Sequence, residues 1–278
     1  MDQANASLTH EPVRWPFQRR DVFYRVTEDS DRLAVIHSLP GVLVWPVLMM
    51  IIAYAFQYAF LSAWNWLGGY ALPIHPVTAS FSALVGGYAC FALILWQNFK
   101  QTGIHRGVFS IIPLKVSEIV AGVLILIFMI TIGGRLTLFL HEYAMADPSL
   151  TFAGGATHEE LSNVDDFAMT GASVWAIIAL TLIAAPIVEE VLFRGWMLPM
   201  MMARGVPAFF AIILSAAAFG IMHISQGLMV MISTFILGLA LGLARVMTGR
   251  VAAPVLGHIA NNAWAVFAVP ALMQQFQA

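Results

Sequence analysis

The stretch APIVEEVLFRG at residues 185–195 places two acids and one guanidinium in the middle of an otherwise apolar run. Inserting one charged side chain at the centre of a bilayer costs at least about 2.5–3.5 kcal/mol, so charged residues at such positions usually have a function. Two further polar clusters follow in apolar surroundings, first His223 and then His258 with Asn262. The pattern predicts a reaction centre built inside a membrane.

The composition indicates a membrane protein with several spanning helices. Of the 278 residues, 60% are hydrophobic and only 10% are charged, whereas soluble proteins usually carry about 25% charged residues. Several apolar runs reach the roughly 18 residues that a transmembrane helix needs. The net charge of −2 gives no sign of nucleic-acid binding. The single cysteine, Cys90, excludes a disulfide framework and a cysteine-based zinc site.

We expect an all-α, polytopic transmembrane helix bundle of about seven spans. Residues 1–38 form a polar segment that could lie on the membrane surface, and residues 39–278 form the transmembrane domain, with its motif-bearing core at 171–270. The expected spans lie near residues 41–64, 77–98, 116–140, 171–203, 206–224, 228–247 and 252–270.

The distribution of Lys and Arg predicts that the N-terminus is inside and the C-terminus outside. The polar head contains five Arg, and the 99–115 loop contains Lys100, Arg106 and Lys115. Two more loops on the same side are marked by Arg204, Arg245 and Arg250. The 141–170 loop contains neither Lys nor Arg but several acids. Only Arg135 departs from this distribution, because it lies near the end of the third span that is predicted to be outside.

The acidic pair is expected to divide its roles by helical geometry. Glu190 and Arg194 lie four residues apart and share a helix face, so they should form an internal ion pair. Glu189 points about 100° away and lacks that partner. A carboxylate so placed can act as a general base. Alternatively, the three groups line a hydrated contact between helices.

His223 is expected to approach Glu189. The turn at residues 204–207, with sequence RGVP, folds the fourth and fifth spans into an antiparallel hairpin. At about 1.5 Å per residue, Glu189 and His223 then reach depths that differ by only about 3 Å. Phe219 shares the face of His223, one turn earlier. A lone histidine on an apolar helix is more often a packing residue, and this alternative stays open.

His258 and Asn262 share one face of the last span. Together they offer two hydrogen-bond donors, as an oxyanion stabiliser requires. The same pair could bind a metal or form an ordinary hydrogen bond between helices. A straight seventh helix would leave His258 roughly 10 Å shallower than His223. Either tilt or a loop around residues 252–254 that enters the protein would have to close this gap.

Other protease chemistries lack their signatures in this sequence. The zinc motif H-E-x-x-H and the serine motif G-x-S-x-G are both absent. An intramembrane aspartyl protease would need a pair of acids in separate spans, and the sequence shows no such pair. A site of glutamate, two histidines and an asparagine remains.

Three spaced motifs then resemble those of a known family. E-E-x-x-x-R at Glu189–Arg194, F-x-x-x-H at Phe219–His223 and H-x-x-x-N at His258–Asn262 resemble the motifs of the CPBP family, the CAAX-protease and bacteriocin-processing group of intramembrane endopeptidases. This family includes the prenyl-protein CAAX endopeptidases. The resemblance covers roughly residues 171–270.

The resemblance implies a role for each catalytic residue. Glu189 with His223 would activate water, and His258 with Asn262 would stabilise the tetrahedral oxyanion. No cofactor is favoured. Zinc or another divalent metal held by Glu189, His223 and His258 is the alternative, since such a set of ligands is chemically reasonable.

Glu190, Arg194 and Phe219 would support the site structurally. The resemblance therefore implies an intramembrane endopeptidase that acts on lipidated or membrane-anchored substrates. We expect an integral protein of the bacterial cytoplasmic membrane, with the lipid bilayer as its surroundings. A non-catalytic scaffold or immunity-type relative is one alternative function. A proton-coupled transporter is another, because intramembrane Glu and His residues can also relay protons.

Overall fold

The computed structural model describes residues 39–67, 76–101, 105–136, 178–224 and 227–268, together with residues 139, 143 and 175. Every regular element in this part of the chain is helical, which confirms the all-α prediction. The polar segment 1–38 and the 141–170 loop lie outside the described residues, apart from residue 143.

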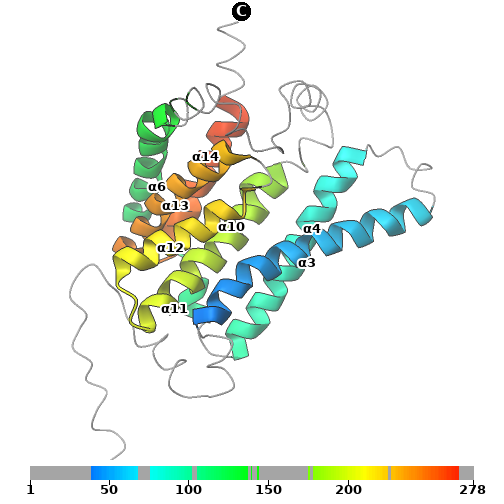
Figure 1. Ribbon diagram of the computed structural model, residues 1–278, viewed down its shortest axis with the longest axis horizontal. Coiled ribbons are helices and arrows are strands. Elements are labelled where there is room, and N and C mark those ends of the chain that lie inside the picture. Colours follow the sequence, from blue (N-terminus) through cyan, green and yellow to red (C-terminus); the bar gives the residue numbers. More distant parts are fainter. Residues whose placement is uncertain are drawn as a thin grey trace, which may run out of the picture.

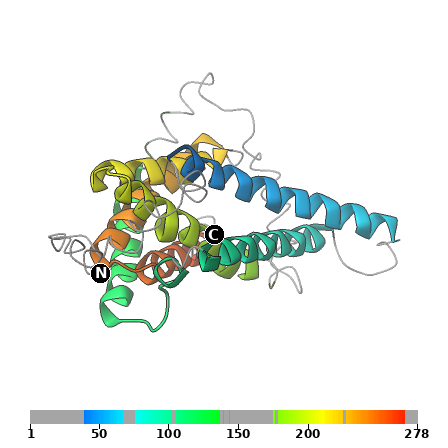
Figure 2. The same ribbon diagram turned by 90° about the horizontal axis from the view of Figure 1, so that it is seen from below.

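The first two long helices form a pair. α3 (Leu39–Trp66) and α4 (Pro76–Gln101) run in opposite directions and pack against each other. Their far ends, near Trp66 and Pro76, project beyond the other helices (Figures 1 and 2). Trp66 is 85% exposed there, as expected for an apolar side chain that no other helix covers.

α5 (His105–Val108) and α6 (Val116–Phe128) follow, and α6 continues into the π-helix η2 (Met129–Gly133). The buried Glu118 holds the start of α6, because its carboxylate accepts a hydrogen bond of 2.8 Å from the backbone N–H of Lys115. The other carboxylate oxygen of Glu118 lies 2.9 Å from the guanidinium of Arg250. This ion pair joins α6 to the turn before the last helix.

The acidic motif lies on one continuous helical path that changes its winding three times. The π-helix η4 (Ala179–Ala184) leads into α10 (Ala185–Glu190), and the π-helix η5 (Val191–Met197) leads into α11 (Leu198–Ala203). Each of the two α-helical segments carries a proline at its second residue, Pro186 and Pro199. π-Turns inside α-helices are rare and frequently mark functional sites.

Three helices complete the described chain, α12 (Ala208–Ile221), α13 (Leu228–Thr248) and α14 (Ala252–Ala263), and α14 continues into the π-helix η7 (Trp264–Ala268). The predicted turns before α12 and α14 are confirmed. Gly205 and Gly249 have φ values of 88° and 69° there, a conformation that glycine adopts without strain. α12 packs on α13, and α14 packs on α6 (Figure 1).

Four of the described helices are long and apolar enough to cross a membrane: Val44–Trp66, Ser82–Lys100, Val116–Leu136 and Val230–Thr248. Ala208–Ile221 is a shorter apolar helix. The remaining expected spans correspond to the broken helical path that carries the acidic motif and to α14 with η7. The count of seven spans stays a prediction, as does the orientation.

A buried aromatic cluster ties the first helix pair to the acidic-motif helix. Trp196 is fully buried, and its ring centroid lies 5.7 Å from that of Trp45 on α3 and 6.0 Å from that of Phe99 on α4. These contacts belong to one core cluster that also includes buried residues of α6, α12, α13 and α14. This packing fixes the acidic-motif helix against both earlier helices.

Candidate active site

Glu190 and Arg194 form the predicted internal ion pair. The Arg194 Nη1 atom lies 2.8 Å from Glu190 Oε1, and both side chains are fully buried. Arg194 Nη2 also donates a hydrogen bond of 3.1 Å to the Gly238 carbonyl on α13, and the guanidinium carbon lies 4.6 Å from the Phe219 ring centroid. A buried guanidinium needs several such partners, because desolvation of the charge is costly.

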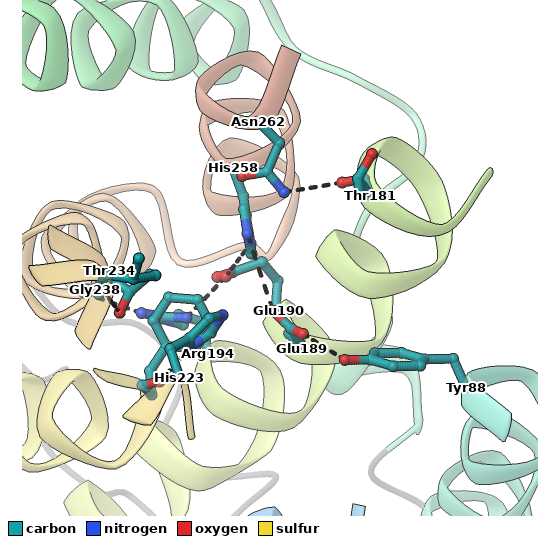
Figure 3. A network of polar contacts seen from close by, with 12 residues as sticks. Tyr88, Thr181, Glu189, Glu190, Arg194, His223, Thr234, Gly238, His258 and Asn262 are labelled. Atoms are coloured by element: carbon teal, nitrogen blue, oxygen red, sulfur yellow. Dashed lines mark hydrogen bonds and ion pairs between the residues drawn. The ribbon is translucent and has the colours of Figure 1, made fainter. Parts of the chain in front are cut away.

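His258 reaches both glutamates. Its Nδ1 atom lies 3.0 Å from Glu190 Oε1, and its Nε2 atom lies 4.0 Å from Glu189 Oε2 (Figure 3). Since Glu190 Oε1 also accepts a hydrogen bond from Arg194, we assign the hydrogen-bonding proton to Nδ1 of His258. The second glutamate of the motif thus holds a guanidinium and an imidazole together.

The start of α14 decides between two alternatives for His258. Residues 252–254 form the first turn of α14. Of the two ways to bring His258 to the acidic pair, tilt of the helix or an entering loop, the loop is therefore not present. Val251, Ala252 and Ala253 are fully buried, so other parts of the protein cover the start of α14.

Phe219 links the two histidines. Its ring centroid lies 4.9 Å from that of His223 and 5.5 Å from that of His258. The Nδ1 atom of His223 lies 2.9 Å from the Phe219 carbonyl oxygen, which can only accept, so Nδ1 carries the proton of this hydrogen bond. In the neutral tautomer that makes this bond, the lone pair is on Nε2. The expected approach of His223 to Glu189 stays a prediction.

Glu189 has a partner that the sequence motifs do not contain. The hydroxyl of Tyr88 on α4 donates a hydrogen bond of 2.8 Å to Glu189 Oε1. Figure 3 shows the two glutamates between Tyr88 on one side and Arg194 with His223 on the other. One signal was present in the sequence, because tyrosine in spanning helices is usually enriched near the membrane interfaces. Tyr88 lies instead near the middle of an apolar run.

Asn262 donates a hydrogen bond of 2.9 Å from Nδ2 to the Thr181 carbonyl oxygen. The π-winding explains this acceptor. The Ala185 N–H group donates a hydrogen bond to the Leu180 carbonyl, five residues earlier. The same spacing pairs the next residue, Pro186, with the Thr181 carbonyl. Proline has no N–H, and Asn262 supplies the missing donor from another helix. Its expected role toward an oxyanion stays a prediction.

The same arrangement recurs one proline later. The Leu198 N–H group donates a hydrogen bond to the Phe193 carbonyl, five residues earlier. The same spacing pairs Pro199, which has no N–H, with the Arg194 carbonyl. The side chain of Arg245, on α13, donates a hydrogen bond of 2.8 Å to the Arg194 carbonyl oxygen. Asn262 and Arg245, from two neighbouring helices, thus donate to the two carbonyls that lie five residues before the prolines.

The metal alternative can be compared with this geometry. Among the residues that the structure describes, no three His, Cys, Asp or Glu side chains come together as a metal site requires. Glu189 and His258 approach each other, but His223 does not complete a group of three ligands with them. The metal-bound site stays an alternative prediction.

The fold and the site define a helical membrane protein with a buried cluster of glutamate and histidine residues. Residues 171–264 match the family model of the Rce1-like type II CAAX prenyl endopeptidases. This match confirms the resemblance to the CAAX-protease group, and the matched segment, with all three motifs, is Rce1-like. No curated protein and no solved structure gives a significant match to the chain.

Proposed function

We propose that this protein is an intramembrane endopeptidase that hydrolyses a peptide bond in lipidated or membrane-anchored substrates. One observation carries the proposal: His258 lies against both glutamates of the Rce1-like segment, in the interior of an apolar helical protein. A carboxylate beside an imidazole is a combination that activates water for attack on a carbonyl group.

Glu189 is the proposed general base. Its Oε2 atom takes a proton from water while the water oxygen bonds to the carbonyl carbon, and the π electrons of the carbonyl move to its oxygen. When the C–N bond breaks, the proton passes from Oε2 to the leaving amine nitrogen. The Nε2 lone pair of His223 would accept a hydrogen bond from the same water. The site is enclosed by apolar helices, and exclusion of bulk water strengthens these electrostatic interactions.

His258 and Asn262 are the proposed oxyanion donors. Nδ1 of His258 donates to Glu190, so His258 would donate to the oxyanion from Nε2 as the imidazolium. Asn262 uses one amide hydrogen for Thr181, so its second amide hydrogen would face the oxyanion. A missing oxyanion donor typically costs about 10²–10³ in kcat.

The substrate class follows from where the site lies. A buried site among lipid-facing helices receives most readily a peptide that is already held in the bilayer. The family description names prenylated substrates of the CAAX type, so a prenylated peptide with a four-residue end is the first substrate to test. Other membrane-anchored peptides form the second group.

The test is cleavage by the purified full chain in lipid nanodiscs, with fluorogenic prenylated and membrane-anchored peptides. We expect Glu189→Gln to lower kcat/KM by at least about 10³ with the fold intact. Glu118→Gln is the matched control, because it changes a buried acid that pairs with Arg250 elsewhere. That control should cleave at nearly the wild-type rate.

The same assay checks the metal question. Chelators for divalent metals should leave the wild-type rate unchanged if protein groups alone carry the reaction. Full activity of Glu189→Gln would remove this residue as the base. Absence of cleavage for every prenylated and anchored peptide would favour a binding or transport function.

A further inference from the structure

Tyr88 contacts the proposed base from outside the Rce1-like segment. Its hydroxyl lies 2.8 Å from Glu189 Oε1, and Glu189 is only 4% exposed. α4 ends at Gln101, whereas the family match begins at residue 171. Neither the three motifs nor the match therefore assigns a role to Tyr88.

The packing of α3 against α4 fixes the backbone beside Tyr88. A Cβ atom on Gly87 would lie 2.8 Å from the backbone of Ala53 on α3, which is closer than real Cβ contacts. Only glycine permits this approach of the two helices. α4 also contacts α10 and η4. The helix that carries Tyr88 is thus held by α3 while its hydroxyl reaches the acidic motif.

The two oxygens of Glu189 have different surroundings. Oε1 accepts the hydrogen bond from Tyr88, whereas Oε2 lies 4.0 Å from Nε2 of His258. A hydroxyl that donates to a carboxylate favours the ionised form and restricts its rotation. Oε1 is therefore committed to Tyr88, and Oε2 is the oxygen that points toward the imidazole.

We propose that Tyr88 is a positioning residue that keeps Glu189 ionised and oriented so that Oε2 receives the proton. The part of this inference that concerns proton transfer rests on the proposed function. The part that concerns the ionisation and orientation of Glu189 rests only on the hydrogen bond. The two parts are tested separately.

The kinetic test compares Tyr88→Phe with wild type in nanodiscs. Phenylalanine keeps the ring and removes only the hydroxyl, so kcat should fall about 10- to 100-fold, the usual effect of a hydrogen bond to a charged group. KM should stay within about twofold, because a positioning residue acts through Glu189 and not on the binding of the substrate. Tyr58→Phe is the matched control, since Tyr58 is 77% exposed on α3, and it should change neither constant.

The second test needs no substrate. Lipid-soluble carbodiimides modify protonated carboxylic acids, so Glu189 should react slowly in wild type and at least about tenfold faster in Tyr88→Phe, as read by mass spectrometry of the peptide with Glu189. Glu189→Gln identifies the labelled residue. An inactive wild type with this labelling difference would reject the peptidase and keep the role of Tyr88. Equal labelling in both proteins would overturn the role of Tyr88, whatever the activity.

A folding defect in Tyr88→Phe is resolved by a double variant. If Tyr88 is needed because Glu189 is charged, Tyr88→Phe with Glu189→Gln should fold, since no buried carboxylate remains without its donor. Failure of the double variant to fold would make Tyr88 a packing residue and overturn the proposal.

Discussion

Glu190 accepts two charged or polar donors in the interior of the protein, the guanidinium of Arg194 and the imidazole of His258. Arg194 in turn has a carbonyl and an aromatic ring as further partners. Such a group is costly to bury but even more costly to leave incomplete. Glu190 therefore holds Arg194 and His258 together, while its neighbour Glu189 is the proposed base.

Replacing Glu190 by Gln tests this division. The change leaves the buried charge of Arg194 without its counter-ion, so the free energy of unfolding should fall by about 3–5 kcal/mol. Denaturant unfolding in detergent measures the loss. In the control, Glu190→Gln combined with Arg194→Met removes both charges, and it should recover much of the stability but not the activity. A single variant as stable as wild type would contradict this account.

Helical spacing predicted some of these contacts and not others. Glu190 and Arg194 lie one turn apart on one helix, so periodicity alone predicted their ion pair. The Tyr88–Glu189 and His258–Glu190 contacts join residues 101 and 68 positions apart. Such contacts depend on how each helix is rotated and how closely it approaches its neighbour. A single sequence does not contain that information, so Tyr88 was missed.

At the scale of the element, the acidic-motif helix depends on side chains from α13 and α14. Pro186 and Pro199 each follow a π-turn, and Asn262 and Arg245 each donate to the carbonyl that lies five residues before one of these prolines. The wide π-turns are thereby stabilised from outside the helix. The winding of the motif helix is set by its neighbours as well as by its own sequence.

A rescue experiment tests this dependence. Arg245→Met should lower the free energy of unfolding by about 1–3 kcal/mol, because the buried Arg194 carbonyl loses its donor. Adding Pro199→Ala supplies an N–H group that can reach the same carbonyl, so the double variant should recover part of the loss. Thermal unfolding of both variants, with Pro199→Ala alone as the control, gives the comparison. A double variant less stable than Arg245→Met would refute the explanation.

The last helix decides between the two alternatives for His258. A loop at residues 252–254 was one of them, yet these residues form the first turn of α14. Proline is tolerated there, because the first N–H groups of a helix have no partner within it. Tilt of the helix, the other alternative, stays a prediction.

At the scale of the whole molecule, two of the predicted inner loops lie together. Arg250, in the turn before α14, donates a hydrogen bond of 2.8 Å to the Pro113 carbonyl and pairs with Glu118. The loop before α6 and this turn are therefore at the same end of the helices, as the distribution of basic residues requires. Which face of the membrane this end occupies is the remaining part of the prediction.

Reporter fusions decide the orientation. A fusion at residue 150 should report the outer side, and a fusion at residue 204 should report the inner side, because Lys and Arg accumulate in inner loops. A fusion at residue 113 serves as the control for residue 204, as both lie in loops predicted to be inside. The reverse pattern at these positions would overturn the topology.

The length of α3 has a consequence for the surrounding lipid. Its apolar part, Val44–Trp66, has 23 residues, or about 35 Å at 1.5 Å per residue, and the hydrocarbon layer is about 30 Å thick. A helix longer than this layer tilts to match it. Because α3 packs tightly on α4 beside Tyr88, a change of tilt is transmitted to the helix that contacts Glu189. We therefore expect the turnover rate to depend on the acyl-chain length of the lipid, so that the same protein turns over at different rates in thin and thick bilayers.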